Sequence, residues 1–275
     1  MKIYAMSDIH GYIDELIKNM KYVDLSGDNK IVFLGDYIDY GDKSCQVLEY
    51  IYELNKKYGD DKVIILKGNH EAMLLDWMKE YSKKVSPDEE ILYFDSFLKS
   101  DAEDNYRMFK TFLSDEAFTD YIEKESKRSF FELNYEAVRL LLAEKRDIIG
   151  FIKKMKPYYE TETQIFIHAG IDEEAVSDIS LIDAWKYSEE RSFYFKYPAT
   201  TGKFFKTIIA GHVGTATISG DHNFHDVFYD GKSHYYIDGS VYKGGKIPLL
   251  MFDSDDKRYY QIEDDKKRIV SKGLL

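Results

Sequence analysis

The sequence predicts an α/β fold in which parallel strands alternate with helices. Three successive units near the N-terminus share one pattern: a run of four apolar residues, a polar or glycine-containing turn, and a segment whose apolar residues have helical spacing. The runs lack the polar–apolar alternation of a half-exposed strand, so they suit strands that are buried on both faces. Strands of this kind, separated by helices, favour right-handed parallel crossovers.

The predicted elements follow in chain order. The first strands are expected at residues 3–6, 31–34 and 63–66, and their helices at residues 13–20, 43–58 and around Trp77. The next segment is rich in charge, has apolar residues three to five positions apart, and lacks the Gly, Pro and Ser content of a linker. We therefore expect a helical insertion at residues 79–156 within one domain spanning residues 1–275. Short apolar runs then predict further strands at residues 165–167, 208–210, 235–237 and 249–252.

Composition excludes several classes of protein. The chain has 50 acidic and 38 basic side chains, a net charge of −12, which argues against nonspecific nucleic-acid binding and against docking on an anionic membrane. The single cysteine, Cys45, excludes an internal disulfide or a cysteine-based zinc cluster. No apolar run approaches the ~20 residues of a membrane helix, and Asp8 and His10 interrupt the first apolar segment too early for a signal peptide. We expect a soluble, cytoplasmic protein.

Polar side chains gather directly after the C-terminal ends of the predicted strands. They are Asp8, His10, Asp36, Asp39, Asn69, His70, His168 and His212. In open α/β sheets, ligands bind at this edge. A single Asp or Asn in such a turn commonly only caps the next helix. Eight such residues after five predicted strands cannot all be caps, and histidine is a poor capping residue, so the sequence predicts a binding site here.

The ligand types at these positions favour a pair of metal ions. Imidazole, carboxylate and amide groups without thiolate suit divalent manganese, iron, zinc or magnesium. The candidate ligands are Asp8, His10, Asp36, Asn69, His168 and His212. These six are more ligands than a single tetrahedral ion uses. Two metals about 3.5–4 Å apart can share a carboxylate, clamp a phosphoryl group and generate hydroxide from water.

Five motifs, in this order, resemble those of calcineurin-like metallophosphoesterases. They are residues 8–11 (DIHG), 35–41 (GDYIDYG), 68–71 (GNHE), 168–170 (HAG) and 211–212 (GH). Within that family the chain is most similar to the phosphoprotein-phosphatase branch, which includes bacterial serine/threonine phosphatases and diadenosine tetraphosphatases. The resemblance implies a four-layer α/β/β/α sandwich. From its length and helical pattern, we expect the insertion to form a cap beside the metal site.

The resemblance also implies a role for each matched residue. Asp8 and His10 would bind the first metal, and Asp36 would bridge both metals. The second metal would be completed by Asn69, His168 and His212. His70 would act as the general acid, with Asp39 holding its other nitrogen and keeping the imidazole charged and oriented. The expected cofactors are two divalent metal ions, manganese first, with iron, zinc or magnesium as alternatives.

Two positions depart from the family pattern. The second motif usually ends in Asp-Arg-Gly, but Tyr40 stands in place of the arginine, and Lys67 replaces the arginine that usually precedes GNHE. Those arginines grip phosphate oxygens with a bidentate fork that tyrosine and lysine do not reproduce. Tyr40 and Lys67 are therefore candidate substrate-binding residues. Arg191 is a candidate replacement fork, although an ordinary surface role is equally consistent with the sequence.

These inferences predict a metal-dependent hydrolase of phosphoester or phosphoanhydride bonds, in which metal-bound hydroxide attacks phosphorus. The first interpretation is a serine/threonine-phosphatase-like enzyme that acts on a phosphorylated peptide. The second is a dinucleoside polyphosphate or small phosphodiester hydrolase with a nucleotide-like substrate. A cap that narrows access to the metal site and the two missing arginines both favour this second interpretation. A third is a catalytically weak regulatory binding module. The complete set of ligands and the pairing of His70 with Asp39 argue against the third.

Overall fold

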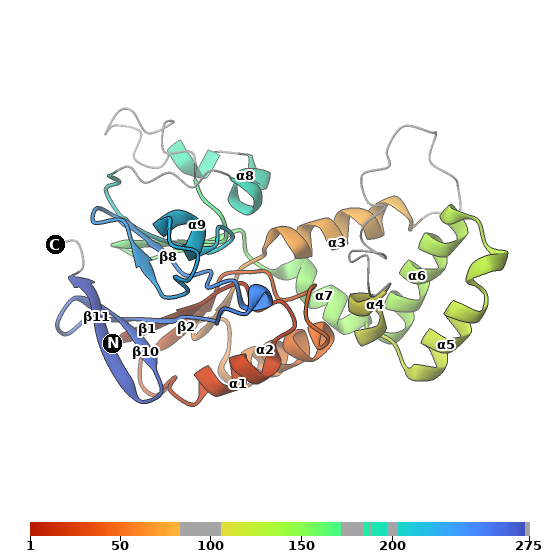
Figure 1. The fold of residues 1–275 in the computed structure, drawn as a ribbon, viewed down its shortest axis with the longest axis horizontal. Coiled ribbons are helices and arrows are strands. Elements are labelled where there is room, and N and C mark those ends of the chain that lie inside the picture. Colours follow the sequence, from red (N-terminus) through yellow and green to blue (C-terminus); the bar gives the residue numbers. More distant parts are fainter. Residues whose placement is uncertain (83–105, 172–183, 188, 197–202, 273–275) are drawn as a thin grey trace.

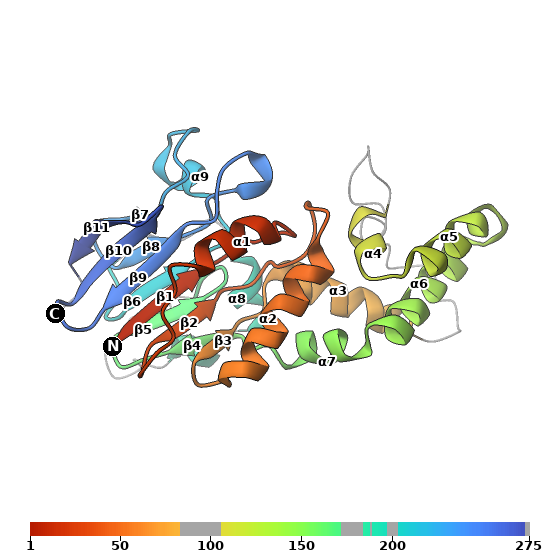
Figure 2. The ribbon, with the colours of Figure 1, turned by 90° about the horizontal axis from the view of Figure 1, so that it is seen from below.

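The computed structural model describes residues 1–82, 106–171, 184–187, 189–196 and 203–272. Two β-sheets lie against each other, and helices cover their outer faces (Figures 1 and 2). The helices of the central segment, α4 (Arg107–Thr111), α5 (Asp115–Glu123) and α6 (Phe130–Glu144), extend to one side of the sheets (Figure 1). Among the described residues, no helix is both long and apolar enough to cross a bilayer.

The first sheet has six strands in the order β11-β10-β9-β1-β2-β3. Their bounds are β1 Lys2–Met6, β2 Lys30–Phe33, β3 Val63–Ile65, β9 Leu249–Asp253, β10 Arg258–Glu263 and β11 Lys266–Lys272. β1, β2 and β3 are parallel, as their apolar runs predict. β9 returns antiparallel to β1, and β10 and β11 continue the sheet as an antiparallel meander.

The second sheet has five strands in the order β4-β5-β6-β8-β7. Their bounds are β4 Tyr158–Glu160, β5 Gln164–Ile167, β6 Thr207–Ala210, β7 Phe228–Tyr229 and β8 His234–Tyr236. β5, β6 and β8 are parallel, and β4 and β7 pair antiparallel at the two edges. In each sheet, the loops that follow the C-terminal ends of the parallel strands lie at one edge, where open α/β sheets bind ligands.

The helices connect these strands and form the outer layers. Their bounds are α1 Ile13–Met20, α2 Ser44–Tyr58, α3 Asn69–Glu80, α4 Arg107–Thr111, α5 Asp115–Glu123, α6 Phe130–Glu144, α7 Arg146–Lys154, α8 Glu190–Phe195 and α9 Thr215–Ser219. Short 3₁₀ turns occupy η1 Glu125–Lys127, η4 Ala184–Tyr187 and η5 Val241–Lys243.

Alternation along the strands produces four layers. Ile3 packs between the sheets with Phe166 of the second sheet. Its neighbour Tyr4 points the other way and packs with Leu16 of α1, because successive side chains of a strand lie on opposite faces. Beyond the second sheet, Trp185 of η4 is buried in a third apolar cluster. The prediction of an α/β/β/α sandwich is confirmed.

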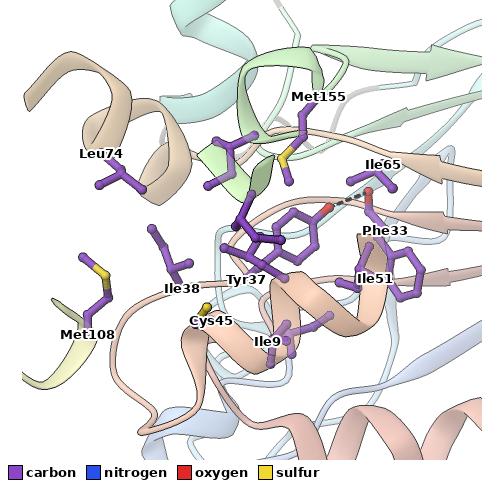
Figure 3. Close-up of a cluster of buried hydrophobic side chains, with 14 of the residues drawn as sticks. Ile9, Phe33, Tyr37, Ile38, Cys45, Ile51, Ile65, Leu74, Met108 and Met155 are labelled. Carbon is purple, nitrogen blue, oxygen red and sulfur yellow. Dashed lines mark hydrogen bonds between the residues drawn. The ribbon is translucent and has the colours of Figure 1, made fainter. Parts of the chain in front are cut away.

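The turn after β2 is anchored by a buried tyrosine. The Tyr37 hydroxyl lies 2.8 Å from the carbonyl oxygen of Leu66 and 3.1 Å from that of Phe33, and Figure 3 shows its ring among the core side chains. Ile38 and Met108 of α4 belong to the same cluster (Figure 3). The turn therefore rests on side chains from both the sheet and the central segment.

The described part of the segment predicted as an insertion is mostly helical. Its predicted start at residue 79 falls within α3, and residues 83–105 lie outside the described residues. α7 packs through Ile149 and Ile152 into the core beneath the first sheet, so this part is a covering helix of the sandwich. Trp77 of α3 donates a 2.7 Å hydrogen bond to Asn134 of α6, which ties the segment to the helix that begins at GNHE. The boundaries 79–156 stay a prediction.

Candidate dinuclear metal site

All eight polar residues predicted from the strand ends converge on one site. Elements of both sheets deliver them: Asp8 and His10 follow β1, Asp36 and Asp39 follow β2, Asn69 and His70 open α3, His168 follows β5, and His212 follows β6. The site lies where the two sheets meet, and most of these side chains are buried.

Asp36 lies at the centre of the arrangement. Its Oδ2 atom is 3.7 Å from His10 Nε2, 3.8 Å from His70 Nε2 and 3.4 Å from His168 Nε2. Two groups of candidate metal ligands share it: His10, Asp36 and His70, and Asp36, His168 and His212, with ligand atoms within 4.8 Å of one another in each group. One carboxylate therefore faces two potential cation positions.

Asn69 and Asp8 complete the two groups. The Asn69 side-chain oxygen lies 2.9 Å from His168 Nε2 and 2.9 Å from His212 Nδ1. Asp8 Oδ1 lies 3.9 Å from His10 Nε2, and the Asp8 carboxylate accepts the backbone N–H of His212 at 3.0 Å. Asp8 thus lies with the first group, and Asn69 lies with the second.

Backbone carbonyls fix the orientation of two imidazole rings. His10 Nδ1 lies 2.8 Å from the Ile38 carbonyl oxygen, and His168 Nδ1 lies 2.8 Å from that of Leu34. Because a carbonyl only accepts, each Nδ1 carries a proton, and each Nε2 faces Asp36. Hydrogen bonds of this kind typically orient metal-binding histidines.

The backbone of the site is held in an unusual conformation. The non-glycine residues with left-handed φ angles include six from the site: Asp8, His10, Asp36, Asp39, Tyr40 and His212. Such conformations cost free energy and cluster at functional sites. A Cβ atom on Gly68 would overlap the Asp36 carboxylate, and one on Gly211 would overlap that of Asp8. Only glycine permits the backbone to approach these carboxylates so closely.

Glu71, a member of the GNHE motif to which no role was assigned from sequence, organises the site loops. Its fully buried carboxylate accepts the backbone N–H groups of Asp36 at 2.9 Å, Tyr37 at 2.8 Å and Gly68 at 3.0 Å. Burial, followed by the nearby charge of Asp36, raises the pKa of Glu71 to about 7. Its position three residues after the N-cap Gly68 is the capping-box signal that identifies it.

Asp238 is a second residue that sequence reasoning did not assign to the site. It is buried, accepts the Ser240 N–H at 2.7 Å, and its own carbonyl accepts the Thr215 N–H at 2.8 Å. Burial raises the pKa of Asp238 to about 6, and the hydrogen bond from Ser240 opposes this rise. Its position after β8 follows the same strand-end rule as the predicted residues, so this rule was the available signal.

The electrostatics of the site fit divalent cations. Burial lowers the pKa of His10 to about 4 and that of His212 to about 4, so both rings are neutral at pH 7 and offer lone pairs. Burial, then the charge of Asp238, raises the pKa of Asp8 well above its usual range. Crowded buried carboxylates beside neutral imidazoles are a donor set whose charge a divalent cation would balance.

His70 and Asp39 form a hydrogen-bonded pair beside the shared carboxylate. His70 Nδ1 lies 2.5 Å from Asp39 Oδ2. Burial opposes a charge on His70, but the Asp36 and Asp39 carboxylates outweigh it and raise the pKa of His70 to about 10. The hydrogen bond to Asp39 engages Nδ1 and leaves Nε2 facing Asp36 and the site, which suits a proton-donating role.

Tyr40 lies at the site, in contact with a tyrosine that the sequence did not single out. Its ring stacks on that of Tyr242 in η5, with centroids 4.1 Å apart and planes 11° apart. The Tyr40 and Tyr242 rings lie 4.8 and 5.3 Å from the His10 ring, and Tyr40 lies 5.4 Å from His70. The two tyrosines therefore wall the site beside His10.

Lys67 and Arg191 lie at the junction of α3 and α8. Lys67 Nζ is 4.0 Å from Glu190 and 5.7 Å from the ring centre of Tyr194. Arg191 Nη1 is 3.6 Å from Asp76 on the α3 surface, and the arginine side chain is 64% exposed. Arg191 therefore belongs to a surface ion pair. This position does not support its predicted role as a phosphate fork.

Comparison with known proteins agrees with this geometry. The description of calcineurin-like phosphoesterases matches residues 1–216, which include all of the predicted ligands. The chain belongs to the calcineurin-like phosphoesterase family. A Caenorhabditis elegans relative with the provisional name serine/threonine-protein phosphatase C27B7.6 is 29% identical over 83 residues, which are 30% of this chain and only 18% of that protein.

Two solved structures of this family's fold are similar over nearly the whole chain. A cold-active protein tyrosine phosphatase superposes with a TM-score of 0.58 and 17% identity, over 98% of this chain and 79% of that one. A protein provisionally named a diadenosine tetraphosphatase gives a TM-score of 0.51 and 12% identity, over 96% and 94% of the two chains. At these identities the likeness concerns the fold.

Proposed function

We propose that this chain is a dinuclear metal-dependent phosphatase that hydrolyses phosphate monoesters, with manganese as its metal. The observation that carries the proposal is the Asp36 carboxylate, which lies within reach of His10 on the one hand and of His168 and His212 on the other. Two-metal hydrolytic sites use such an arrangement to hold both ions against one phosphoryl group. Membership of the calcineurin-like phosphoesterase family supports the same reaction class.

The residues present would hold two cations. Asp8, His10 and Asp36 would bind one, and Asn69, His168, His212 and Asp36 the other. When bound, the ions supply Lewis acidity toward the phosphoryl oxygens and a nucleophile from water at neutral pH. Oxygen and imidazole donors without thiolate suit manganese, and also iron, zinc or magnesium.

The chain's own side chains would control the proton on the leaving group. Asp39 accepts a hydrogen bond from the Nδ1–H group of His70. The Nε2–H group of His70 is therefore left near Asp36, where it faces the site. His70 would donate this proton to the departing ester oxygen and become neutral. The Tyr40 and Tyr242 rings cover His10, which is 2% exposed, and would exclude water on that side.

A phosphorylated peptide is the first substrate class in this proposal. The names of the C. elegans relative and of the cold-active phosphatase, which concern phosphoproteins, support it. The net charge of −12 disfavours nonspecific nucleic-acid and membrane partners.

A dinucleoside polyphosphate or small phosphodiester is the second substrate class. Tyr40 provides no guanidinium group. The ammonium group of Lys67 already interacts with the Glu190 carboxylate and the Tyr194 ring. The absence of a bidentate fork weakens the binding of a terminal dianionic phosphate most, and it weakens the binding of a diester or anhydride less. The similarity in fold to the protein provisionally named a diadenosine tetraphosphatase supports this alternative.

A substrate panel with added manganese tests the proposal. It compares a phosphothreonine peptide, a phosphotyrosine peptide, diadenosine tetraphosphate and bis-p-nitrophenyl phosphate, alongside elemental analysis of the wild type and Asp36→Asn. We expect the highest kcat/KM with a phosphopeptide, two metal equivalents in the wild type, and loss of metal and activity in Asp36→Asn. Preference for diadenosine tetraphosphate or the diester would establish the second class. Metal binding without turnover of any substrate would indicate a regulatory binding module.

A further inference from the structure

One arginine of the central helical segment contacts the turn that carries the general-acid pair. Arg107, the first residue of α4, donates a hydrogen bond from Nη1 to the backbone carbonyl of Tyr40 at 2.8 Å, across 67 positions of sequence. A hydrogen bond from a charged donor is shorter and stronger than one between neutral groups. This contact joins the helical segment to the metal site.

The rest of α4 is docked at the same place. Met108 shares an apolar cluster with Ile38, which lies in the same turn (Figure 3). The Thr111 hydroxyl accepts the backbone N–H of Cys45, in the first turn of α2, at 3.1 Å. The shared apolar cluster and the two hydrogen bonds thus fix the position from which Arg107 acts.

The turn that Arg107 contacts is strained. Asp39 and Tyr40 have φ angles of 71° and 61°, a left-handed conformation that is unfavourable for consecutive residues with side chains. The next amide, Gly41 N–H, points back to the His10 carbonyl at 2.8 Å. Such a backbone persists only when its surroundings hold it, and a hydrogen bond to the Tyr40 carbonyl does so directly.

We propose that Arg107 is a positioning residue of the site: it holds the Asp39–Tyr40 turn in place, so that the docking of the central segment sets how well Asp39 aligns His70. The assignment rests on the proposed function for its catalytic consequence. In this role Arg107 acts through the Tyr40 carbonyl and through Asp39.

The test compares Arg107→Gln with the wild type, with Lys110→Ala as the matched control. Lys110 is exposed on the same helix, with its ammonium near the Phe118 ring, so its loss removes a charge without touching the turn. Two substrates are used: glycerol phosphate, whose leaving oxygen needs a proton, and p-nitrophenyl phosphate, whose leaving group does not. Hydrogen exchange of the Gly41 amide gives a readout that does not depend on turnover.

We expect Arg107→Gln to lower kcat for glycerol phosphate on the order of 10-fold, a fraction of the ~10²–10⁴-fold that general-acid catalysis supplies. KM and the rate with p-nitrophenyl phosphate should change little, Gly41 exchange should accelerate, and Arg107→Lys should restore part of kcat. Lys110→Ala should resemble the wild type.

Equal losses for both substrates would overturn the assignment, and so would a rise in KM alone, which would mark Arg107 as a phosphate-binding residue. Unchanged exchange at Gly41 would also overturn it. A wild type without turnover would instead overturn the proposed function, while the exchange rates would still decide whether Arg107 holds the turn.

Discussion

At the scale of single residues, the charge on His70 depends on two carboxylates that outweigh the effect of burial. Asp36 and Asp39 together raise the pKa of His70 to about 10. A general acid acts while it is protonated, which is below its pKa, so turnover should fall as the pH rises through the pKa that His70 has in the metal-loaded site. The carboxylate that can be removed without touching a metal ligand is Asp39.

Asp39→Asn should therefore move the alkaline limb of kcat to lower pH. The amide keeps a hydrogen-bond acceptor for His70 but removes the negative charge that favours the imidazolium. The measurement is kcat against pH with glycerol phosphate, in wild type, Asp39→Asn and Asp14→Asn. Asp14 is an exposed residue paired with Lys43, and its variant serves as the control. An alkaline limb at the same pH in all three proteins would contradict the role of Asp39.

Tyr40→Arg tests whether the residue at this turn selects the substrate. A guanidinium adds charge-assisted hydrogen bonds, so kcat/KM for a phosphate monoester should rise roughly 10-fold relative to bis-p-nitrophenyl phosphate. Tyr40→Phe, which retains the ring stacked on Tyr242, should leave that ratio near the wild-type value. A ratio that does not move in Tyr40→Arg would show that this position does not discriminate between monoesters and diesters.

At the scale of elements, one buried hydrogen bond joins α3 to α6. Asn134 is 1% exposed and accepts the indole N–H of Trp77 at 2.7 Å. Asn134→Ala removes the acceptor from a buried donor, which typically costs about 1–3 kcal/mol of unfolding free energy. Chemical denaturation measures this cost. Adding Trp77→Phe to Asn134→Ala removes the donor as well and isolates the coupling between the two residues. A loss that is strictly additive would mean that the hydrogen bond contributes nothing.

Much of the fold and most of the site follow from local patterns in the sequence. The strands β1, β2, β3, β5, β6, β8 and β9 coincide within a residue or two with apolar runs, because strands buried on both faces need such runs. The bounds of β10 and β11 were not predicted from the sequence, because residues such as Arg268 and Ile269 follow no clear alternation on a half-exposed edge.

The residues missed at the site share a different cause. Glu71 acts through backbone N–H groups, and Tyr242 acts by stacking on a residue about 200 positions earlier. Neither contact enters an argument from ligand spacing, and the signal for Glu71 is instead its capping-box position after Gly68. The stacking of Tyr40 on Tyr242 also occupies a ring face that the sequence left open for a substrate.

At the scale of the whole molecule, the candidate ligands come from both sheets. Asp8 and Asp36 follow strands of the first sheet, while His168 and His212 follow strands of the second. Cations bound between them would therefore link the two halves of the sandwich. Binding to the folded chain alone stabilises it by mass action, by about 2.7 kcal/mol at a metal concentration 100 times Kd.

Removal of metal should consequently lower the melting temperature, by roughly 5–10 °C for a chain of this size. Thermal unfolding with excess manganese, compared with unfolding in a chelator, measures the shift. Asp36→Asn should show a much smaller difference between the two conditions, since it removes the shared ligand. A wild-type melting temperature that is the same in chelator and in manganese would contradict metal binding across the sheets.

The distribution of ligands along the chain also orders events during synthesis. Asp8 and His212, which contact each other in the folded site, are 204 positions apart. At ~5–20 residues per second, roughly 10–40 s pass between the translation of the first and the last ligand. During that interval β1 also lacks its antiparallel neighbour β9, which is translated later still. Until the C-terminal strands emerge, the nascent chain therefore carries an unpaired edge at β1, and its acidic ligands Asp8 and Asp36 lack the histidines His168 and His212 that complete the site.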